Sequence, residues 1–138
     1  MKIEQTTDLA ACHALRRAVF IEEQGVSEFE EMDDKDNEAI HLLAWQDDRP
    51  VGSARILLLG DTGKIGRVCV LAPARGTGLG AALIRAALDV LRDRPGIARA
   101  KLSSQTHALG FYEKLGFTAH GPVYDDAGIP HRDMTRDL

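Results

Sequence analysis

The stretch that decides the fold is VCVLAPARGTGLG at residues 68–80, which runs directly into AALIRAALDVL at residues 81–91. A β-branched apolar run enters a turn with three glycines in five residues, and a segment with helical apolar spacing leaves it. We therefore expect a strand that delivers a glycine-rich loop to the N-terminus of a helix. The first amides of such a helix lack intrahelical partners and lie at the positive end of its dipole, so this place is suited to binding phosphate.

The spacing of the glycines excludes the two commonest nucleotide-binding motifs. Gly76, Gly78 and Gly80 run G-x-G-x-G, whereas the dinucleotide fingerprint requires G-x-G-x-x-G and a P-loop requires Lys-Ser/Thr after its last glycine. The pattern from Arg75 to Gly80 is Arg-x-x-Gly-x-Gly. It resembles the pyrophosphate-binding motif of the GNAT superfamily of acyl-CoA-dependent N-acetyltransferases. For this loop alone, a helix start that needs glycine only for close packing is an equally good interpretation.

A second motif lies about one expected strand downstream. Residues 105–117, QTHALGFYEKLGF, resemble the superfamily's A-x-x-F-Y-x-K-x-G-F motif, with matches at Ala108, Phe111, Tyr112, Lys114, Gly116 and Phe117. An aromatic core helix closed by a glycine would explain the apolar positions. It would not explain why this helix follows an Arg-x-x-Gly-x-Gly turn, so the two motifs together indicate a GNAT domain.

Composition restricts the class of protein. The chain has 138 residues, enough for one domain with a proper core, and its net charge of −4 argues against nucleic acid as the main partner. No apolar run approaches the roughly 18 residues that span a bilayer, and no signal-peptide pattern is present, so we expect a cytoplasmic protein without a membrane partner. Cys12 and Cys69 are expected as reduced core thiols. The five histidines lack metal-ligand spacing, so no metal is predicted.

The expected elements form one α+β domain over residues 1–138. Expected strands span 1–5, 39–45, 51–59, 64–71, 97–104, 117–124 and 130–135. Expected helices run from Asp8 to Gly25, from 78 to 92 with an apolar face at Leu79, Leu83, Ala86, Ala87 and Val90, and from Thr106 to Leu115. The resemblance implies a mixed, mostly antiparallel sheet of six to seven strands with about four helices. Its central strands would splay apart to form a cleft for CoA.

Carried over residue by residue, the resemblance implies a binding site for acetyl-CoA as co-substrate. Backbone amides would hold the pyrophosphate at Arg75, Gly76, Thr77, Gly78, Leu79 and Gly80. The main chains of Val68 and Val70 would bind the pantetheine and the acetyl carbonyl. Gln105 stands where many members carry Asn against the cofactor arm, and Phe111 completes the expected cofactor-binding set.

The resemblance also implies direct transfer without a covalent enzyme intermediate. The attacking amine must be neutral and the thiolate must leave, so both proton steps gain from positioned groups. The N–H of Val70 would stabilise the oxyanion. Tyr112 is the candidate acid for the departing sulfur, although a packed aromatic would look the same. Cys69 should face the side of the sheet opposite to Val68 and Val70.

The N-terminal half carries a narrower resemblance. The chain is similar to a poorly characterised branch of small bacterial GNAT acetyltransferases in Arg16-x-x-Val19-Phe20-x-x-Glu23-Gln24, Glu31-x-Asp33-x-x-Asp36, His41 and Gly128-Ile129-Pro130-His131. Part of the same pattern also resembles acyl-homoserine-lactone synthases, which are built on the same fold, namely Arg16, Phe20, Glu31, Asp33, Asp36 and Arg55.

The run from Glu22 to Glu38 contains nine acidic residues and one basic residue, Lys35. It could draw in a cationic amine and supply a base, with Glu23 as first choice. Alternatively, most of these carboxylates are solvated while two or three pair with Arg16 and Arg55, and for most of them this second interpretation is favoured.

Two histidines complete the list of candidate site residues. His131 is a second candidate base, although a lone histidine more often serves structure. His41 is expected as a hydrogen-bonded residue of the sheet.

The leading prediction is an N-acetyltransferase that acts on a primary amine of a small molecule. A protein acceptor, a non-catalytic acyl-CoA-binding or sensing module, and an acyltransferase related to the acyl-homoserine-lactone synthases are the alternatives. The sequence does not specify the acceptor. The free edge of the terminal hairpin favours a homodimer but leaves the oligomeric state open.

Overall fold

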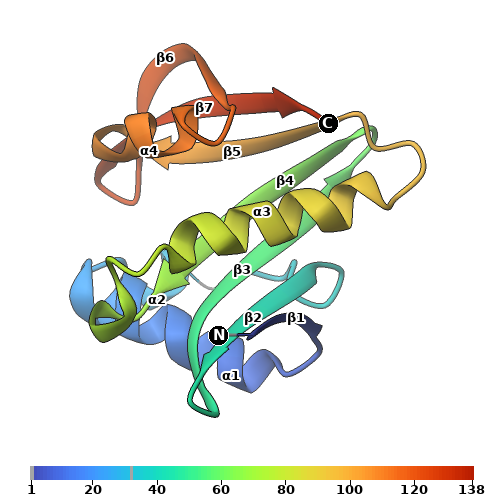
Figure 1. The fold of residues 1–138 in the computed structure, drawn as a ribbon. Helices are drawn as coiled ribbons and strands as arrows, with labels where there is room; N and C mark the ends of the chain where they lie inside the picture. The colour runs from blue at the N-terminus through green and yellow to red at the C-terminus, as the bar shows by residue number, and fades with distance from the viewer. Residues whose placement is uncertain (1, 32) are drawn as a thin grey trace.

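Seven strands form one sheet in the order β1-β2-β3-β4-β5-β7-β6 in the computed structural model, which describes residues 2–31 and 33–138 (Figure 1). Neighbouring strands are antiparallel except β4 and β5, which are parallel. The predicted sheet of mostly antiparallel strands is therefore confirmed. The strands are β1 Lys2–Thr6, β2 Ile40–Gln46, β3 Arg49–Leu59, β4 Thr62–Val70, β5 Arg99–Gln105, β6 Thr118–Asp126 and β7 Ile129–Asp137.

Helices cover both faces of this sheet. The α-helices are α1 Leu9–Arg16, α2 Glu28–Glu31, α3 Leu79–Arg92 and α4 Leu109–Glu113, with a π-helix η1 Arg17–Glu23 and 3₁₀ turns η2 Ala72–Ala74 and η3 Thr106–Ala108. Leu42 packs in the cluster that contains α3, whereas its neighbour Leu43 packs in the cluster that contains α1. Because successive strand residues point to opposite faces, α1 and α3 lie on opposite sides of the sheet. Within the described residues, no helix is long and apolar enough to span a bilayer.

The glycine-loop helix α3 buries a wider face than its sequence spacing predicted. Ala86 and Val90, two of the expected face residues, are only half-buried. The residues of α3 that are buried are Leu79, Leu83, Ile84, Ala87, Leu88 and Leu91. A Cβ on Gly63 would lie 2.2 Å from a Leu91 methyl, so the absence of a side chain there lets α3 pack directly on β4.

The predicted N-terminal helix is interrupted by a change of helix type. Asp8 caps α1 as expected, because its side chain accepts a 3.1 Å hydrogen bond from the amide of Ala11. The chain then passes into the π-helix at Arg17, a rare form that often occurs at functional sites. Gly25 follows with φ of 74°, which ends the helical run as expected. The short helix α2 was not predicted.

The third predicted helix also differs from expectation at its start. Thr106 does not cap it but begins the 3₁₀ turn η3, and α4 itself begins at Leu109. Gly116 follows α4 with φ of 90°, and the amide of Phe117 donates to the carbonyl of Tyr112 at 3.1 Å. This left-handed glycine therefore closes the helix as predicted.

The central strands β4 and β5 splay apart, as the resemblance implied. They pair only where Thr62–Lys64 meets Arg99–Lys101, and from there they separate toward α4 (Figure 1). A bulge in β4 accompanies this change, because Ser53 pairs with Cys69 while Arg55 pairs with Gly66. Arg67 in the bulge has φ of 50°. From Ile65 to Val70, the edge of β4 facing β5 therefore has no partner strand in the described chain.

The two cysteines are buried free thiols. Cys69 packs with Cys12 on the α1 side, whereas Val68 and Val70 pack against the α3 cluster, so the predicted alternation is confirmed. Burial raises the pKa of the Cys12 thiol to about 11 and also raises that of Cys69. Both thiols are therefore protonated at neutral pH, as expected for core residues.

Candidate active site

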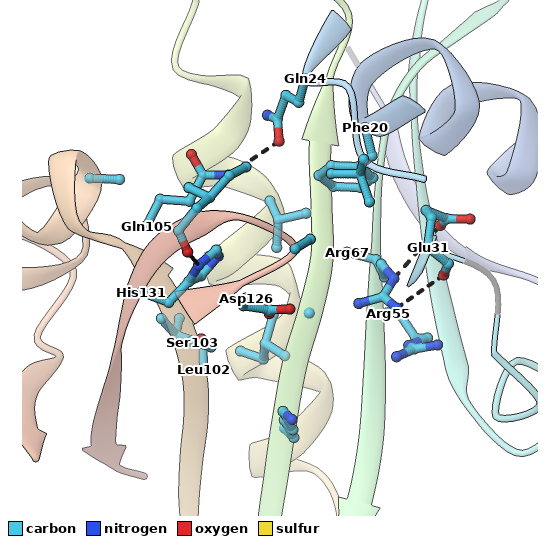
Figure 2. A pocket seen from close by; sticks show the side chains of 18 of the residues that line it. Phe20, Gln24, Glu31, Arg55, Arg67, Leu102, Ser103, Gln105, Asp126 and His131 are labelled. Atoms are coloured by element: carbon cyan, nitrogen blue, oxygen red, sulfur yellow. Dashed lines mark hydrogen bonds and ion pairs between the residues drawn. The ribbon is translucent and has the colours of Figure 1, made fainter. Parts of the chain in front are cut away.

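A cleft of about 320 Å³ lies where β4 and β5 have separated (Figure 2). The face of β3 and β4 forms its floor, and the end of the π-helix forms one wall through Phe20 and Gln24. The opposite wall consists of β5, α4 and the β6–β7 hairpin. Tyr112 and His131, predicted from separate stretches of sequence, both line this cleft.

His131 is held in a defined tautomer. Its Nδ1 lies 2.7 Å from the main-chain carbonyl oxygen of Ile129. A carbonyl oxygen can only accept, so Nδ1 carries the hydrogen, and the neutral ring keeps its lone pair on Nε2. The ring also stacks on Tyr124 with a centroid distance of 6.3 Å, and the Tyr124 hydroxyl donates to Asp133 at 2.6 Å. These contacts fix the ring of a potential base.

Tyr112 is held by its aromatic neighbours. Its ring makes edge contacts with Phe111 and Phe117 at centroid distances of 4.9 and 6.2 Å. Burial raises the pKa of its hydroxyl above the ordinary value. The hydroxyl therefore remains protonated through neutral pH, as a general acid requires.

The glycine loop, residues 75–80, has the open geometry expected of a phosphate site. Gly76 and Gly78 have φ of 79° and 83°, and a Cβ built on either would meet nothing within 4 Å. Glycine is therefore needed at these two positions for the left-handed backbone conformation and not for close packing. Gly78 caps α3, so the first amides of that helix face out of this open loop. A Cβ on Gly80 would lie 3.6 Å from the Phe111 ring, so the two sequence motifs are adjacent in space.

The glycine loop lies beside the cleft, and residues 75–80 are absent from its lining in the described structure. Glu23 lies with the loop. Its two carboxylate oxygens accept hydrogen bonds of 2.5 and 2.7 Å from Arg75, whose Nε also donates to the carbonyl of Val70 at 3.0 Å. Arg75 lowers the pKa of Glu23. The structure therefore places the first-choice base away from the lining of the cleft, as an ionised and weaker base.

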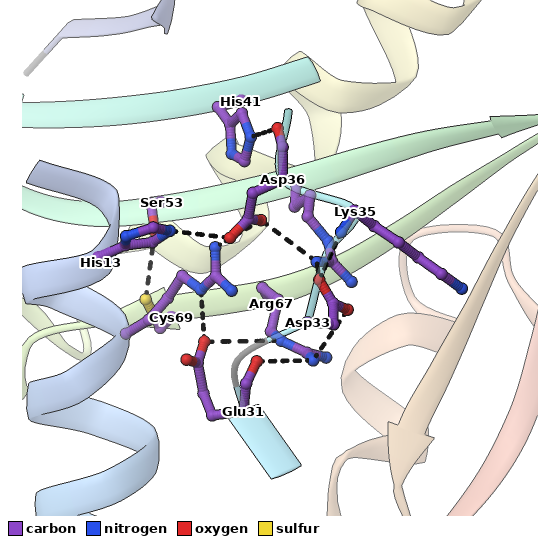
Figure 3. A network of polar contacts seen from close by, with 11 residues as sticks. His13, Glu31, Asp33, Lys35, Asp36, His41, Ser53, Arg67 and Cys69 are labelled. Atoms are coloured by element: carbon purple, nitrogen blue, oxygen red, sulfur yellow. Dashed lines mark hydrogen bonds and ion pairs between the residues drawn. The ribbon is translucent and has the colours of Figure 1, made fainter. Parts of the chain in front are cut away.

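The acidic run forms a buried network with three arginines (Figure 3). Arg16, which is 1% exposed, donates to Glu31 at 2.5 Å and to Asp36 at 2.9 Å. Arg55 donates to Asp33 at 2.8 Å and to Asp36 at 3.3 Å. The prediction that two or three of these carboxylates pair with Arg16 and Arg55 is confirmed. The paired members of the run do not present a negative surface to a cationic substrate.

Asp36 is the centre of this network. Its carboxylate also accepts from His13 at 2.8 Å, and its main-chain carbonyl accepts from His41 at 2.9 Å, which confirms the structural role expected of His41. Burial alone would raise the pKa of Asp36, but hydrogen bonds from Arg16 and His13 outweigh it and hold the pKa well below its usual range. Among the described residues, no group of three or more His, Cys, Asp or Glu is placed to hold a metal ion.

Gln105 connects the two walls of the cleft. Its Nε2 donates to Oε1 of Gln24 at 3.2 Å, and its Oε1 accepts from Nε2 of His107 at 2.6 Å. Val68 lines the cleft, whereas Val70 lies further along the open edge of β4. The main chains of both valines are thus on the strand edge that the resemblance assigned to the cofactor arm.

Two cationic residues of the cleft were missed by sequence reasoning, Lys64 and Arg67. They lie on either side of Gly66 in β4. A glycine inside a strand is a bulge signal, and the bulge places Arg67 beside Glu31 on the α1 side of the sheet. This signal was available in the sequence.

Comparison with known proteins agrees with the geometry. The model of the family described as "Acetyltransferase (GNAT) domain" matches residues 6–138. Escherichia coli ElaA is 34% identical over 96% of this chain and 89% of its own length. Its crystal structure superimposes with a TM-score of 0.86 at 31% identity, covering 98% of this chain and 99% of that one.

Two further structures extend the comparison. An acyl-CoA N-acyltransferase from Pseudomonas aeruginosa has a TM-score of 0.86 at 32% identity over 98% of this chain and 97% of its own. The CoA-dependent acyl-homoserine lactone synthase BjaI has a TM-score of 0.76 at 22% identity over 94% of this chain and 76% of its own. The second likeness shows the shared fold alone.

Proposed function

The chain belongs to the GNAT acetyltransferase family, and we propose that it transfers the acetyl group of acetyl-CoA to a primary amine of a small molecule. The observation that carries this proposal is the cleft lined by both a partly buried, protonated Tyr112 and a His131 whose Nε2 lone pair is free. These are the acid and the base that amine acylation by a thioester requires.

The residues present fit acyl-CoA as the donor, which would supply the activated acetyl thioester. The outward amides at the start of α3 and the open sides of Gly76 and Gly78 suit a pyrophosphate. The unpaired edge of β4 offers main-chain groups of Val68 and Val70 to an extended chain such as pantetheine. Gln105 and Phe111 lie on the facing side, with Phe111 next to Gly80.

Each catalytic group has one task. Nε2 of His131 accepts the proton of the attacking amine, because a protonated amine has no lone pair for attack. The N–H of Val70 stabilises the negative charge that develops on the acyl oxygen. The hydroxyl of Tyr112 donates its proton to the departing sulfur. No side-chain nucleophile is required, because the amine attacks directly.

The experiment that tests this function follows thiol release from acetyl-CoA against a panel of amines, with mass spectrometry of the products. We expect turnover with at least one amine and a large loss in Tyr112→Phe and His131→Gln. His120→Gln is the matched control, because His120 is exposed on the same hairpin outside the cleft. Tight CoA binding without turnover across the panel would instead favour a non-catalytic acyl-CoA-binding module.

The donor site has its own test in Gly78→Leu. Gly60 provides the control, because it also has positive φ, 63°, with nothing within 4 Å, but it lies in the β3–β4 turn. Both substitutions place a side chain on a left-handed backbone in open space, so Gly60→Leu should retain CoA affinity while Gly78→Leu loses it. Equal CoA affinity in the two variants would contradict the assignment of the glycine loop.

A further inference from the structure

The charges that line the cleft are unequally compensated. Arg55 is neutralised by Asp33 and Asp36, and Glu31 accepts a hydrogen bond from Arg16. The remaining charged residues of the lining are Lys64, Arg67 and Asp126. Figure 2 shows Arg67 beside Glu31 on one side of β4 and Asp126 with His131 on the other.

Arg67 makes two long ion pairs and donates to no side-chain carboxylate at hydrogen-bond distance among the described residues. The nearest carboxylate oxygens, on Asp33 and Glu31, lie 3.6 and 3.7 Å from its guanidinium nitrogens. Its Nη2 donates to the main-chain carbonyl of Glu31 at 3.0 Å, while its buried Nε has no hydrogen-bond partner in the described structure. Burial lowers the pKa of Arg67, and the nearby positive charges of Arg55 and Arg16 lower it further.

Lys64 also lines the cleft and is more exposed to solvent than Arg67. It makes no ion pair within the described part of the chain. Partial burial lowers the pKa of its ammonium, and the positive charges of Lys101 and Lys35 add to that effect while Asp133 opposes it. An anion placed between Lys64 and Arg67 would therefore relieve an unfavourable positive field on both side chains.

We propose that the amine acceptor also carries a carboxylate, which Lys64 and Arg67 bind, so that the substrate class is amino acids. This inference rests on the proposed acetyl transfer. Arg16, Arg55 and Arg67 balance the charges of Glu31, Asp33 and Asp36, so Lys64 and Asp126 are the charged residues of the lining that make no ion pair within the described chain. An amino acid, with one carboxylate and one ammonium, complements both. Asp126 belongs to the same hairpin as His131, so it can receive the ammonium form of the acceptor on the side of the cleft where the base removes its proton.

The charge balance distinguishes this substrate class from two others. A polyamine would bring further positive charge to Lys64 and would leave it without an anion, which costs free energy. A phosphate dianion would leave an excess of negative charge beside Asp126. An arginine fork and a lysine together bind carboxylate through charge-assisted hydrogen bonds.

The experiment compares matched acceptors. Glycine, β-alanine, γ-aminobutyrate and a set of larger α-amino acids are assayed for acetylation beside their own carboxamides and simple alkylamines. The proteins are the wild type, Lys64→Gln, Arg67→Gln and the control Lys101→Gln, whose residue lies opposite Lys64 in the sheet but outside the cleft. The ratio of kcat/KM for each acid to that for its amide is measured within one protein. Comparing this ratio between variants cancels the difference in amine basicity.

We expect at least one acid to exceed its amide in kcat/KM, and the preference to fall about tenfold or more in Lys64→Gln and Arg67→Gln but not in Lys101→Gln. Alkylamines or carboxamides that equal the acids, or a preference unchanged in both variants, would overturn the proposal.

Binding separates this proposal from the proposed function. If no amine is acetylated, calorimetric titration of the same acids into the CoA-loaded protein shows whether the carboxylate site exists. Acid binding that is lost in Lys64→Gln supports the carboxylate site while the transfer function fails. Absence of acid binding overturns both.

Discussion

Nδ1 of His131 donates a hydrogen bond of 2.7 Å to the main-chain carbonyl of Ile129, two residues earlier in the β6–β7 hairpin. This hydrogen bond to the backbone of the hairpin thus determines the tautomer of the His131 side chain in the cleft. With the hydrogen on Nδ1, Nε2 is the acceptor of the neutral ring, and this makes His131 a candidate base. The GIPH stretch at residues 128–131 supplies both residues.

His131→Gln should lower kcat/KM by about a hundredfold or more, because glutamine cannot take the proton of the amine. The loss should shrink as the pH is raised toward about 10, where free amines lose their proton in solution without help. The pH dependence of thiol release in wild type and variant measures this. A deficit that is constant with pH would assign His131 a structural role.

Tyr112→Phe should reduce kcat by about a hundredfold with little change in CoA affinity, because the ring still packs on Phe111 and Phe117 while the proton donor is lost. Burial raises the pKa of Tyr112, so the acid remains competent on the alkaline side of neutrality. Steady-state kinetics with calorimetric CoA binding checks both parts. A variant with wild-type kcat would leave Tyr112 as a packing residue.

Glu23→Gln distinguishes a base from a residue that positions Arg75. Because Arg75 holds the Glu23 carboxylate, we expect the substitution to change KM for acetyl-CoA while kcat stays within about threefold of wild type. Glu22→Gln, at the neighbouring position, is the control. If kcat instead collapses and KM is unchanged, Glu23 is the base after all.

Asp36→Asn should destabilise the fold by about 3 kcal/mol at neutral pH, because it removes one partner of a buried charge network. The folded-state pKa of Asp36 is depressed, so its contribution is present above the unfolded pKa of about 3.9 and is lost as the pH falls through the folded value. Urea unfolding between pH 7 and 3 should therefore show a steeper loss of stability in wild type than in the variant. Parallel curves would contradict this role.

The sequence was sufficient for the fold and the donor loop because both depend on local patterns. The glycine spacing after residue 75 and the aromatic motif at residues 108–117 are read directly from the chain, and the structure brings Gly80 against Phe111. The pairing of the acidic run with Arg16 and Arg55 was also predicted, and the buried carboxylates of Glu31 and Asp36 do require cations.

What sequence reasoning missed depends on tertiary contacts. The ion pair of Glu23 with Arg75 joins residues 52 positions apart, and no local pattern indicates it. The apolar residues of Arg17–Glu23 would suit an α-helix equally well, so their spacing does not indicate a π-helix. Arg67 lies in the bulge of β4 with φ of 50°, so regular strand alternation could not place its side chain, although Gly66 indicates the bulge in the sequence.

The most direct test of the account is a crystal structure with CoA bound and an acceptor amine soaked in. The account predicts the pyrophosphate on the amides of residues 76–80, the sulfur within hydrogen-bonding distance of the Tyr112 hydroxyl, and the amine nitrogen within hydrogen-bonding distance of Nε2 of His131. A sulfur outside the cleft between β4 and β5, or an acceptor bound away from His131, would contradict it.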